Sequence, residues 1–188
     1  MGGGDESSSA EPLAAPESSS PTDVRELPLP TDLPAQTCLD WVSFETPREA
    51  ASDAGAVLLG TVVERSGTAE FYGVDSTRWM FDVERVLERP EPLREGAELP
   101  PEIPVSAGDR ISIVSTPETC SGDGDPYPSG DPLDPATGRQ GADGTVIVVL
   151  SGAWGDDSEL GEPSLITPYQ GVLTPTDDGA LPAEWPAP

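Results

Sequence analysis

Four aspartates carry oxygen atoms that could hold a hard cation. Asp123, Asp125, Asp131 and Asp134 lie in the Gly- and Pro-rich stretch 121–143, which predicts a long connection without regular structure. Carboxylate oxygens in a flexible loop are ligands that calcium accepts. Their spacing does not follow the EF-hand pattern, and no glutamate closes the set. We therefore expect a solvated, disordered loop, with calcium binding as the alternative.

The two cysteines, Cys38 and Cys120, could form a disulfide. Cys38 precedes the first segment with apolar content, and Cys120 follows a strand-like run, so each flanks an expected core element. An even number of cysteines in an exported protein favours a disulfide. We predict a bond between them, and two separate thiols are the alternative. Two cysteines without histidine are too few for a tetrahedral zinc site.

Three aromatic residues are candidates for contact with a ligand. Phe71 and Tyr72 fall in an expected loop over residues 65–77, and Trp154 falls in the glycine-containing stretch 152–157. Aromatic rings beside carboxylates suit sugars, peptides or a cationic partner. The simpler interpretation is that these rings cap the ends of a small fold, which needs aromatic area for its stability.

Composition excludes several other chemistries. The chain has 188 residues, with 35 acidic residues, nine basic residues that are all arginine, no histidine and a formal net charge of -26. Without histidine, neither a Ser-His-Asp triad nor a histidine-based zinc site can form. Nucleic-acid phosphates and anionic lipid repel an acidic surface, and a net charge of this size favours a soluble monomer. Two carboxylates suffice for glycoside hydrolysis, but no pair is marked, so no catalytic residue is assigned.

One helix followed by five strands should position these groups. The run 46–49, Thr-Pro-Arg-Glu, is a capping box that predicts a helix from Pro47 to about Asp53. Alternating or continuous apolar residues between turn signals predict strands at 56–63, 78–84, 110–116, 145–151 and 165–173. A helix is the alternative for the second segment. Pro168 predicts a bulge or an edge in the last strand, and Trp185 could dock back on the fold.

The regions outside these elements predict a tether and a tail. Residues 1–37 combine Ser, Pro and acidic residues without an aromatic residue, so they predict a disordered tether. Residues 38–174 form the expected domain, and 175–188 an irregular tail. The first residues have neither the basic nor the apolar region of an export signal. Because similar tethers follow the lipidated cysteine of bacterial lipoproteins, we expect Met1 to replace the end of a removed signal, with an ordinary disordered N-terminus as the alternative.

Five segments carry a resemblance to a known family: "AVLLGTVVE", "RWMFDVERVL", "GDRISIVSTPETC", "TVIVVLSG" and "LITPYQGVL". With the preceding helix, they resemble the OB-fold-type domains of uncharacterised actinobacterial lipoproteins, which are related in shape to netrin and tissue-inhibitor-of-metalloproteinase modules. The resemblance implies a mainly β fold, a small five-stranded Greek-key (OB-like) barrel with one short N-terminal helix and long loops. Metalloproteinase inhibitors of that shape bind metal through a free N-terminal cysteine. Cys38 follows 37 residues, so that mechanism is not transferred.

These features favour a binding function at the outside of a bacterial cell. We expect a non-catalytic interaction or ligand-binding module, held at the membrane only through a lost N-terminal lipid anchor, with an unknown surface ligand or protein as partner. Ligands are expected near the loops between the first and second strands and between the fourth and fifth. No cofactor is expected apart from calcium. The alternatives are a secreted carboxylate-based hydrolase and a calcium-dependent adhesion domain.

Overall fold

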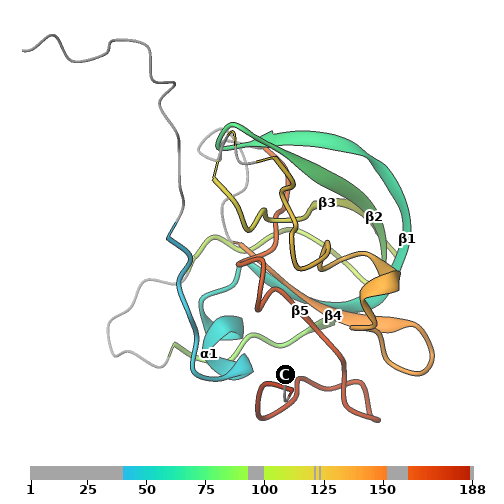
Figure 1. Ribbon diagram of the computed structural model, residues 1–188. Coiled ribbons are helices and arrows are strands. Elements are labelled where there is room, and N and C mark those ends of the chain that lie inside the picture. Colours follow the sequence, from blue (N-terminus) through green and yellow to red (C-terminus); the bar gives the residue numbers. More distant parts are fainter. Residues whose placement is uncertain (1–39, 93–99, 121, 123, 152–160, 187–188) are drawn as a thin grey trace, which may run out of the picture. The chain divides into compact units, whose positions relative to one another are not determined.

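The computed structural model describes residues 40–92, 100–120, 122, 124–151 and 161–186. The fold is mainly β, as predicted. Its elements are α1 (Pro47–Ser52), β1 (Ala56–Phe71), β2 (Val74–Leu87), β3 (Arg110–Val114), the 3-10 helix η1 (Pro135–Thr137), β4 (Thr145–Leu150) and β5 (Val172–Leu173). The strands form one antiparallel sheet in the order β3-β2-β1-β4-β5 (Figure 1). Within the described ranges, no helix has the length and apolar character of a membrane span.

The short helix α1 forms where the capping box predicts it. The Thr46 side chain accepts a hydrogen bond from the Glu49 backbone N–H at 3.1 Å, and Pro47 occupies the first helical position. The Glu49 carboxylate accepts from the backbone N–H of Glu45 at 2.6 Å, one residue before the position that a capping box implies. The helix ends at Ser52, one residue short of the expected end.

The continuous apolar runs of β1 and β4 reflect burial on both faces of the sheet. In β1, Ala56 and Leu58 enter one cluster of buried side chains, while Val57 and Leu59 enter the other. β4 is buried along its whole length and divides its side chains in the same way. We call the first cluster the inner core: Ala56, Leu58, Val62, Trp79, Phe81, Val83, Ile103, Ile113, Leu133, Val146, Val148, Leu150, Leu165 and Val172.

The second cluster, the outer core, is covered by α1 and the C-terminal segment. Its buried members are Phe44, Ala50, Ala51, Ala54, Val57, Leu59, Ile147, Val149 and Leu173. The two helical alanines carry only a methyl group, which lets α1 approach the sheet closely. Leu181 and Trp185 pack against the same cluster, so the predicted docking of Trp185 is confirmed. The described residues belong to one compact unit, whereas the predicted tether falls outside them.

β2 is buried on one face only, as its alternating pattern predicts. Trp79, Phe81 and Val83 are buried, whereas Asp82 is half-buried and Glu84 is exposed. Alternation with period two is the signature of a strand, so the helical alternative for this segment is wrong.

The expected loop over residues 65–77 is instead the distal part of a long hairpin. β1 and β2 pair as far as Phe71 and Val74, and only Tyr72 and Gly73 connect them. Both connecting residues have positive φ, 48° and 76°, as tight hairpin turns between twisted strands require. Most of the distal β1 residues are exposed, so backbone pairing rather than burial holds them. Burial patterns therefore give no signal for this part of the strand.

The predicted fifth strand is mostly irregular, and the sheet is not closed into a barrel. β5 contains two residues, and between the described parts of β3 and β5 no ladder forms. Residues 163–166 lie across this gap. Ser164 bridges in parallel to Val114, and Leu165 bridges antiparallel to Leu150. Residues 167–170 then turn, because a proline at position 168 cannot donate to a ladder.

The stretch predicted as a solvated, disordered loop is ordered over its described residues, 122 and 124–143. Leu133 is buried in the inner core and Tyr127 is also buried. η1 adds one turn of 3-10 helix. The prediction was wrong because average composition hides two apolar anchors among many polar residues. Each anchor removes apolar area from water, and together they offset part of the entropy of ordering the loop.

Candidate functional site

Three candidate residues, Cys38, Asp123 and Trp154, lie outside the described residues. Cys120 is half-buried and lies in the irregular segment that follows β3. The disulfide between Cys38 and Cys120 therefore stays a prediction. The role of Trp154 in ligand contact also stays a prediction.

Asp125 and Asp134 serve the backbone of their own loop. An oxygen of Asp125 accepts from the Tyr127 backbone N–H at 2.9 Å. Asp134 caps η1 and accepts from the Ala136 backbone N–H at 2.8 Å. Aspartates commonly hold turns by accepting from the backbone two residues later. These contacts explain both side chains without a metal ion.

Asp131 anchors the same loop to the sheet. One carboxylate oxygen accepts from Nε1 of Trp79 at 2.9 Å. The other accepts from Oγ of Ser115 at 2.5 Å and from the Leu133 backbone N–H at 3.1 Å. Among the described residues, no group of three or more acidic or cysteine side chains is placed to hold a metal ion. The structure thus gives Asp131 a structural role.

Tyr127 is inserted between two strands at the end of their pairing. Its hydroxyl accepts from the Thr77 backbone N–H and donates to the Ser115 carbonyl, both at 2.8 Å. Burial raises the pKa of the Tyr127 hydroxyl to about 12, so it stays protonated and can donate near neutral pH. The sequence analysis missed this residue. Its proline neighbours in Asp-Pro-Tyr-Pro were a signal of a fixed conformation.

The aromatic residues at the hairpin turn contact one another. The rings of Phe71 and Trp41 stack with centroids 6.1 Å apart, and Tyr72 meets Phe71 edge-on at 4.7 Å. Phe71 is buried, and Nε1 of Trp41 donates to the carbonyl of Pro117 at 3.1 Å. For Phe71, these contacts favour the capping interpretation. Tyr72 remains exposed.

Three carboxyl groups at the surface have pKa values below their usual range. In each case the largest cause is a side-chain hydrogen bond, from Arg110 to Asp82, from Thr145 to Asp143 and from Thr176 to Asp178. A general acid near neutral pH needs a raised pKa. None of these three groups therefore suits the acid of a carboxylate-based hydrolase.

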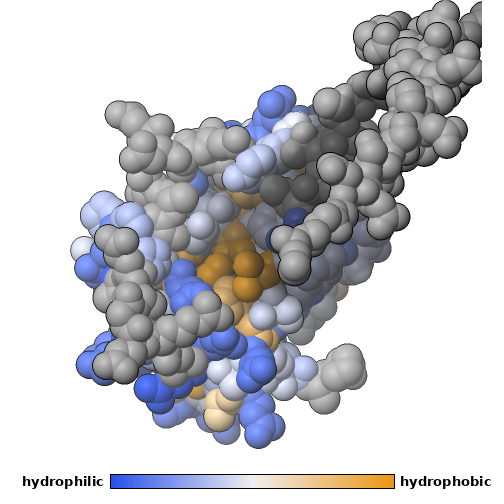
Figure 2. All heavy atoms as spheres, turned by 90° about the vertical axis from the view of Figure 1, so that its left-hand side faces the viewer, coloured by the Kyte–Doolittle hydropathy of each residue, from blue (hydrophilic) through white to orange (hydrophobic). Residues whose placement is uncertain are grey.

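Hollows on the surface offer a second type of candidate site. Figure 2 shows hydrophobic atoms gathered in a hollow with hydrophilic atoms beside it. Among the described residues, we consider two mostly apolar pockets, each with one arginine in its lining. We call them the Arg89 pocket and the Arg139 pocket.

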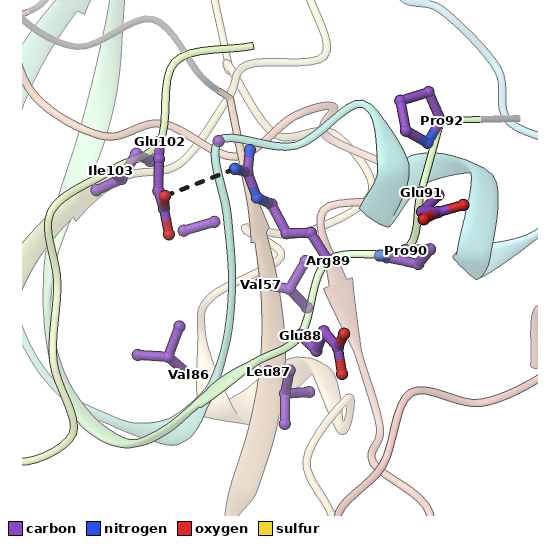
Figure 3. Close-up of a pocket in the computed structure, with 12 residues that line it drawn as sticks. Val57, Val86, Leu87, Glu88, Arg89, Pro90, Glu91, Pro92, Glu102 and Ile103 are labelled. Atoms are coloured by element: carbon purple, nitrogen blue, oxygen red, sulfur yellow. Dashed lines mark ion pairs between the residues drawn. The ribbon is translucent and has the colours of Figure 1, made fainter. Parts of the chain in front are cut away.

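The Arg89 pocket lies where β1 begins and β2 ends, and has a volume of about 420 Å³ (Figure 3). Nη1 of Arg89 donates to the carbonyl of Ala54 at 2.8 Å and to that of Pro100 at 3.3 Å. Nη2 lies 3.9 Å from a carboxylate oxygen of Glu102. The arginine therefore braces neighbouring segments of the chain. This use leaves few of its donors for a ligand.

The Arg139 pocket lies between β5 and the C-terminal segment and has a volume of about 530 Å³. Small-molecule sites typically measure about 300–1,000 Å³ and are mostly apolar with a few polar groups. The lining follows this pattern: Arg139, Tyr169, Gln170, Val172, Leu173, Thr174, Trp185 and Pro186. The Tyr169 side chain is 54% exposed, so its ring is accessible at the surface.

Hydrogen bonds to Phe44 fix two walls of the Arg139 pocket. The Gln170 amide accepts from the Phe44 backbone N–H and donates to the Phe44 carbonyl, both at 2.9 Å. Nε1 of Trp185 donates to the same carbonyl at 3.0 Å. These bonds join positions far apart in sequence. The pocket is therefore held in its shape before any ligand binds.

Arg139 is the charged group of this pocket. Nη1 donates to the Tyr169 carbonyl at 3.5 Å, the outer limit of a hydrogen bond. With the described part of the chain it forms no ion pair, and none of the pocket's lining residues is acidic. In a chain of net charge -26, this is a local excess of positive charge beside an apolar surface.

The sequence analysis missed the Arg139 pocket. Its lining comes from three regions that the sequence analysis treated separately. Arg139 lies in the expected disordered loop, Tyr169 in the expected fifth strand and Trp185 in the expected tail. The docking of Trp185 was predicted, but no local pattern indicates that Arg139 lies next to it.

Comparison with known proteins adds no assignment to this geometry. The chain matches no protein-family model, no curated protein and no solved structure. The described residues form a small, mainly β domain, and the Arg139 pocket is an apolar cavity of small-molecule size within it. The function must therefore be inferred from the pocket.

Proposed function

We propose that this protein is a non-catalytic ligand-binding module and that the Arg139 pocket is its binding site. The observation that carries the proposal is a preformed, mostly apolar pocket of about 530 Å³ with an arginine that has no ion pair among the described residues. Large apolar pockets with a few convergent polar groups are the usual places for ligands. The calcium alternative has less support, because Asp125, Asp131 and Asp134 bond within their own loop or to the sheet. The hydrolase alternative has less support, because Asp82, Asp143 and Asp178 have lowered pKa values.

We further propose that the open sheet follows an OB-like Greek-key arrangement. β1 pairs with both β2 and β4, which brings distant strands together. The backbone of Val114 donates to the Pro163 carbonyl at 2.8 Å and accepts from the Leu165 N–H at 3.2 Å. Ser151 donates to the Ser164 carbonyl at 2.9 Å on the other side. These bonds place residues 163–166 between the ends of β3 and β4, which supports the OB-like arrangement.

The proposed setting is the outer surface of a bacterial cell, where a lipid anchor would hold the domain at the membrane. The net charge of -26 favours a monomer. The acidic composition, the Gly- and Ser-rich N-terminal residues and the two cysteines support this proposal. A surface with this charge is a poor partner for nucleic acid. Display outside the cell would give the pocket access to ligands in the surroundings.

Screening a fragment library by NMR should identify compounds that bind the wild-type protein, and Tyr169→Ala should weaken their binding by about tenfold. The reason is that Tyr169 supplies an exposed ring to the pocket and has little role in the core. Tyr72→Ala is the matched control, since it removes another exposed tyrosine at the hairpin turn. We expect Tyr72→Ala to bind as the wild type does. A library without binders, or binding lost only in Tyr72→Ala, would contradict the proposed site.

A further inference from the structure

We infer that the Arg139 pocket takes a small aromatic carboxylate, with the ring in the apolar part and the carboxylate on Arg139. The inference rests on the proposed function and adds the chemical class of the ligand. It follows from three properties of the pocket: its charge, the use of its polar groups and its size.

The charge of the pocket favours an anion. The Arg139 guanidinium has five N–H donors, of which one makes a long hydrogen bond to the Tyr169 carbonyl. A planar guanidinium matches a carboxylate through two parallel hydrogen bonds. No acidic residue lines the pocket to compete for it. The side chain is half-buried, so screening by water is weaker there than at a fully exposed arginine.

Several polar groups of the pocket walls already have hydrogen-bond partners within the protein, which favours a ligand that is mostly apolar. Both ends of the Gln170 amide and Nε1 of Trp185 are bonded to Phe44. The Thr174 hydroxyl donates to the carbonyl of Arg139 at 2.8 Å. A sugar needs many partners for its hydroxyl groups, and polar groups buried without partners weaken binding. A ring can instead pack on Val172, Leu173 and the aromatic walls.

The volume and the position of Arg139 favour a small molecule. A pocket of about 530 Å³ accommodates a drug-sized ligand. The hydrogen bond from Thr174 holds the backbone of Arg139 at the pocket's edge. Arg139 is thus placed before binding to meet a carboxylate at one end of a bound ring.

Three probes with one ring system test the charge preference. Indole-3-acetate, indole-3-acetamide and tryptamine carry an anionic, a neutral and a cationic group on an indole ring. In NMR titrations at low salt, we expect the acetate to bind about tenfold more tightly than the acetamide, and tryptamine to bind most weakly. This order of affinities is a strict test of the pocket, because the net charge of -26 on the whole chain repels anions.

Arg139→Gln should reduce the affinity for the acetate to that for the acetamide. Arg65→Gln, the matched control, removes the same charge from the exposed part of β1 and should keep the preference. Circular dichroism checks that both variants fold. If Arg139→Gln does not fold, Arg139→Lys replaces it: the charge remains, the two-pronged geometry is lost, and the preference should shrink.

Four results would overturn the inference. The first is equal binding of the acetate and the acetamide to the wild-type protein. The second is a preference for the acetate that persists in Arg139→Gln. Either result would leave the proposed function intact. Dimerisation of the wild type that is lost in Arg139→Gln would show that a second copy occupies the pocket. Binding of none of the three probes would also overturn the inference, and the fragment screen would then decide the proposed function separately.

Discussion

Replacing Asp131 by alanine is expected to lower the free energy of unfolding by about 3 kcal/mol. The substitution removes the acceptor for Nε1 of Trp79, Oγ of Ser115 and the Leu133 backbone N–H. A buried polar group that loses its partner costs about 1–3 kcal/mol. Ser115 and Trp79 are buried, so water cannot easily replace the carboxylate. Urea denaturation followed by circular dichroism measures the change.

Asp134→Ala is the control for Asp131→Ala. Asp134 caps η1 through one hydrogen bond in an exposed part of the same loop. Its removal should cost about 1 kcal/mol, the usual value of a helix cap. Equal effects of the two substitutions would mean that the loop is not anchored to the sheet through Asp131.

Gly60→Ala is expected to lower the free energy of unfolding by about 3 kcal/mol, although alanine is ordinarily more favourable than glycine inside a strand. Gly60 lies in β1 under the ring of Phe81, which is completely buried. A β-carbon at position 60 would collide with the carbonyl oxygen of Asp82 and lie 2.8 Å from the Phe81 ring. Adding atoms to a close-packed core forces side chains or backbone to move and costs about 1–3 kcal/mol or more. The same urea titration measures the effect.

Gly108→Ala separates this steric effect from backbone strain. Gly108 has a φ of +93°, and a β-carbon there would meet no atom within 4 Å. Only the unfavourable backbone conformation remains, with an expected cost of about 1 kcal/mol. A Gly60→Ala protein as stable as Gly108→Ala would show that Phe81 does not pack on β1 as described.

Local sequence patterns predicted the elements whose signals are local. The capping box defines α1 because its contacts lie within a few residues of Thr46. Burial on both faces makes β1 and β4 continuously apolar, and burial on one face gives β2 its alternation. Each of these patterns follows from the periodicity of side chains along an element.

The other features depend on contacts between distant residues. The hairpin continues past residue 65 because the mostly exposed distal part of β1 pairs with β2 through its backbone, which leaves no apolar pattern in that part of β1. The loop after Cys120 is ordered by Tyr127 and Leu133, and only the fold shows what they contact. Residues 163–166 contact β3 and β4 only through single bridges, which involve too few residues for a strand pattern.

The candidate site was predictable only in part, for the same reason. Phe71 and Tyr72 do lie together, because they are neighbours in sequence. The Arg139 pocket joins an arginine, a tyrosine and a tryptophan from three separate segments. Each is unremarkable in its own segment, and only the packing of the C-terminal residues against the outer core brings them together.

Backbone-amide chemical-shift mapping with a bound fragment tests most directly whether the Arg139 pocket is the binding site. The largest shifts should fall on Arg139, on residues 169–174 and on Trp185, because these residues surround the cavity. Smaller shifts should reach Phe44, whose backbone is bonded to two of the walls. Shifts that cluster instead at Tyr72 or around the Arg89 pocket, with the Arg139 pocket unchanged, would contradict the proposed site.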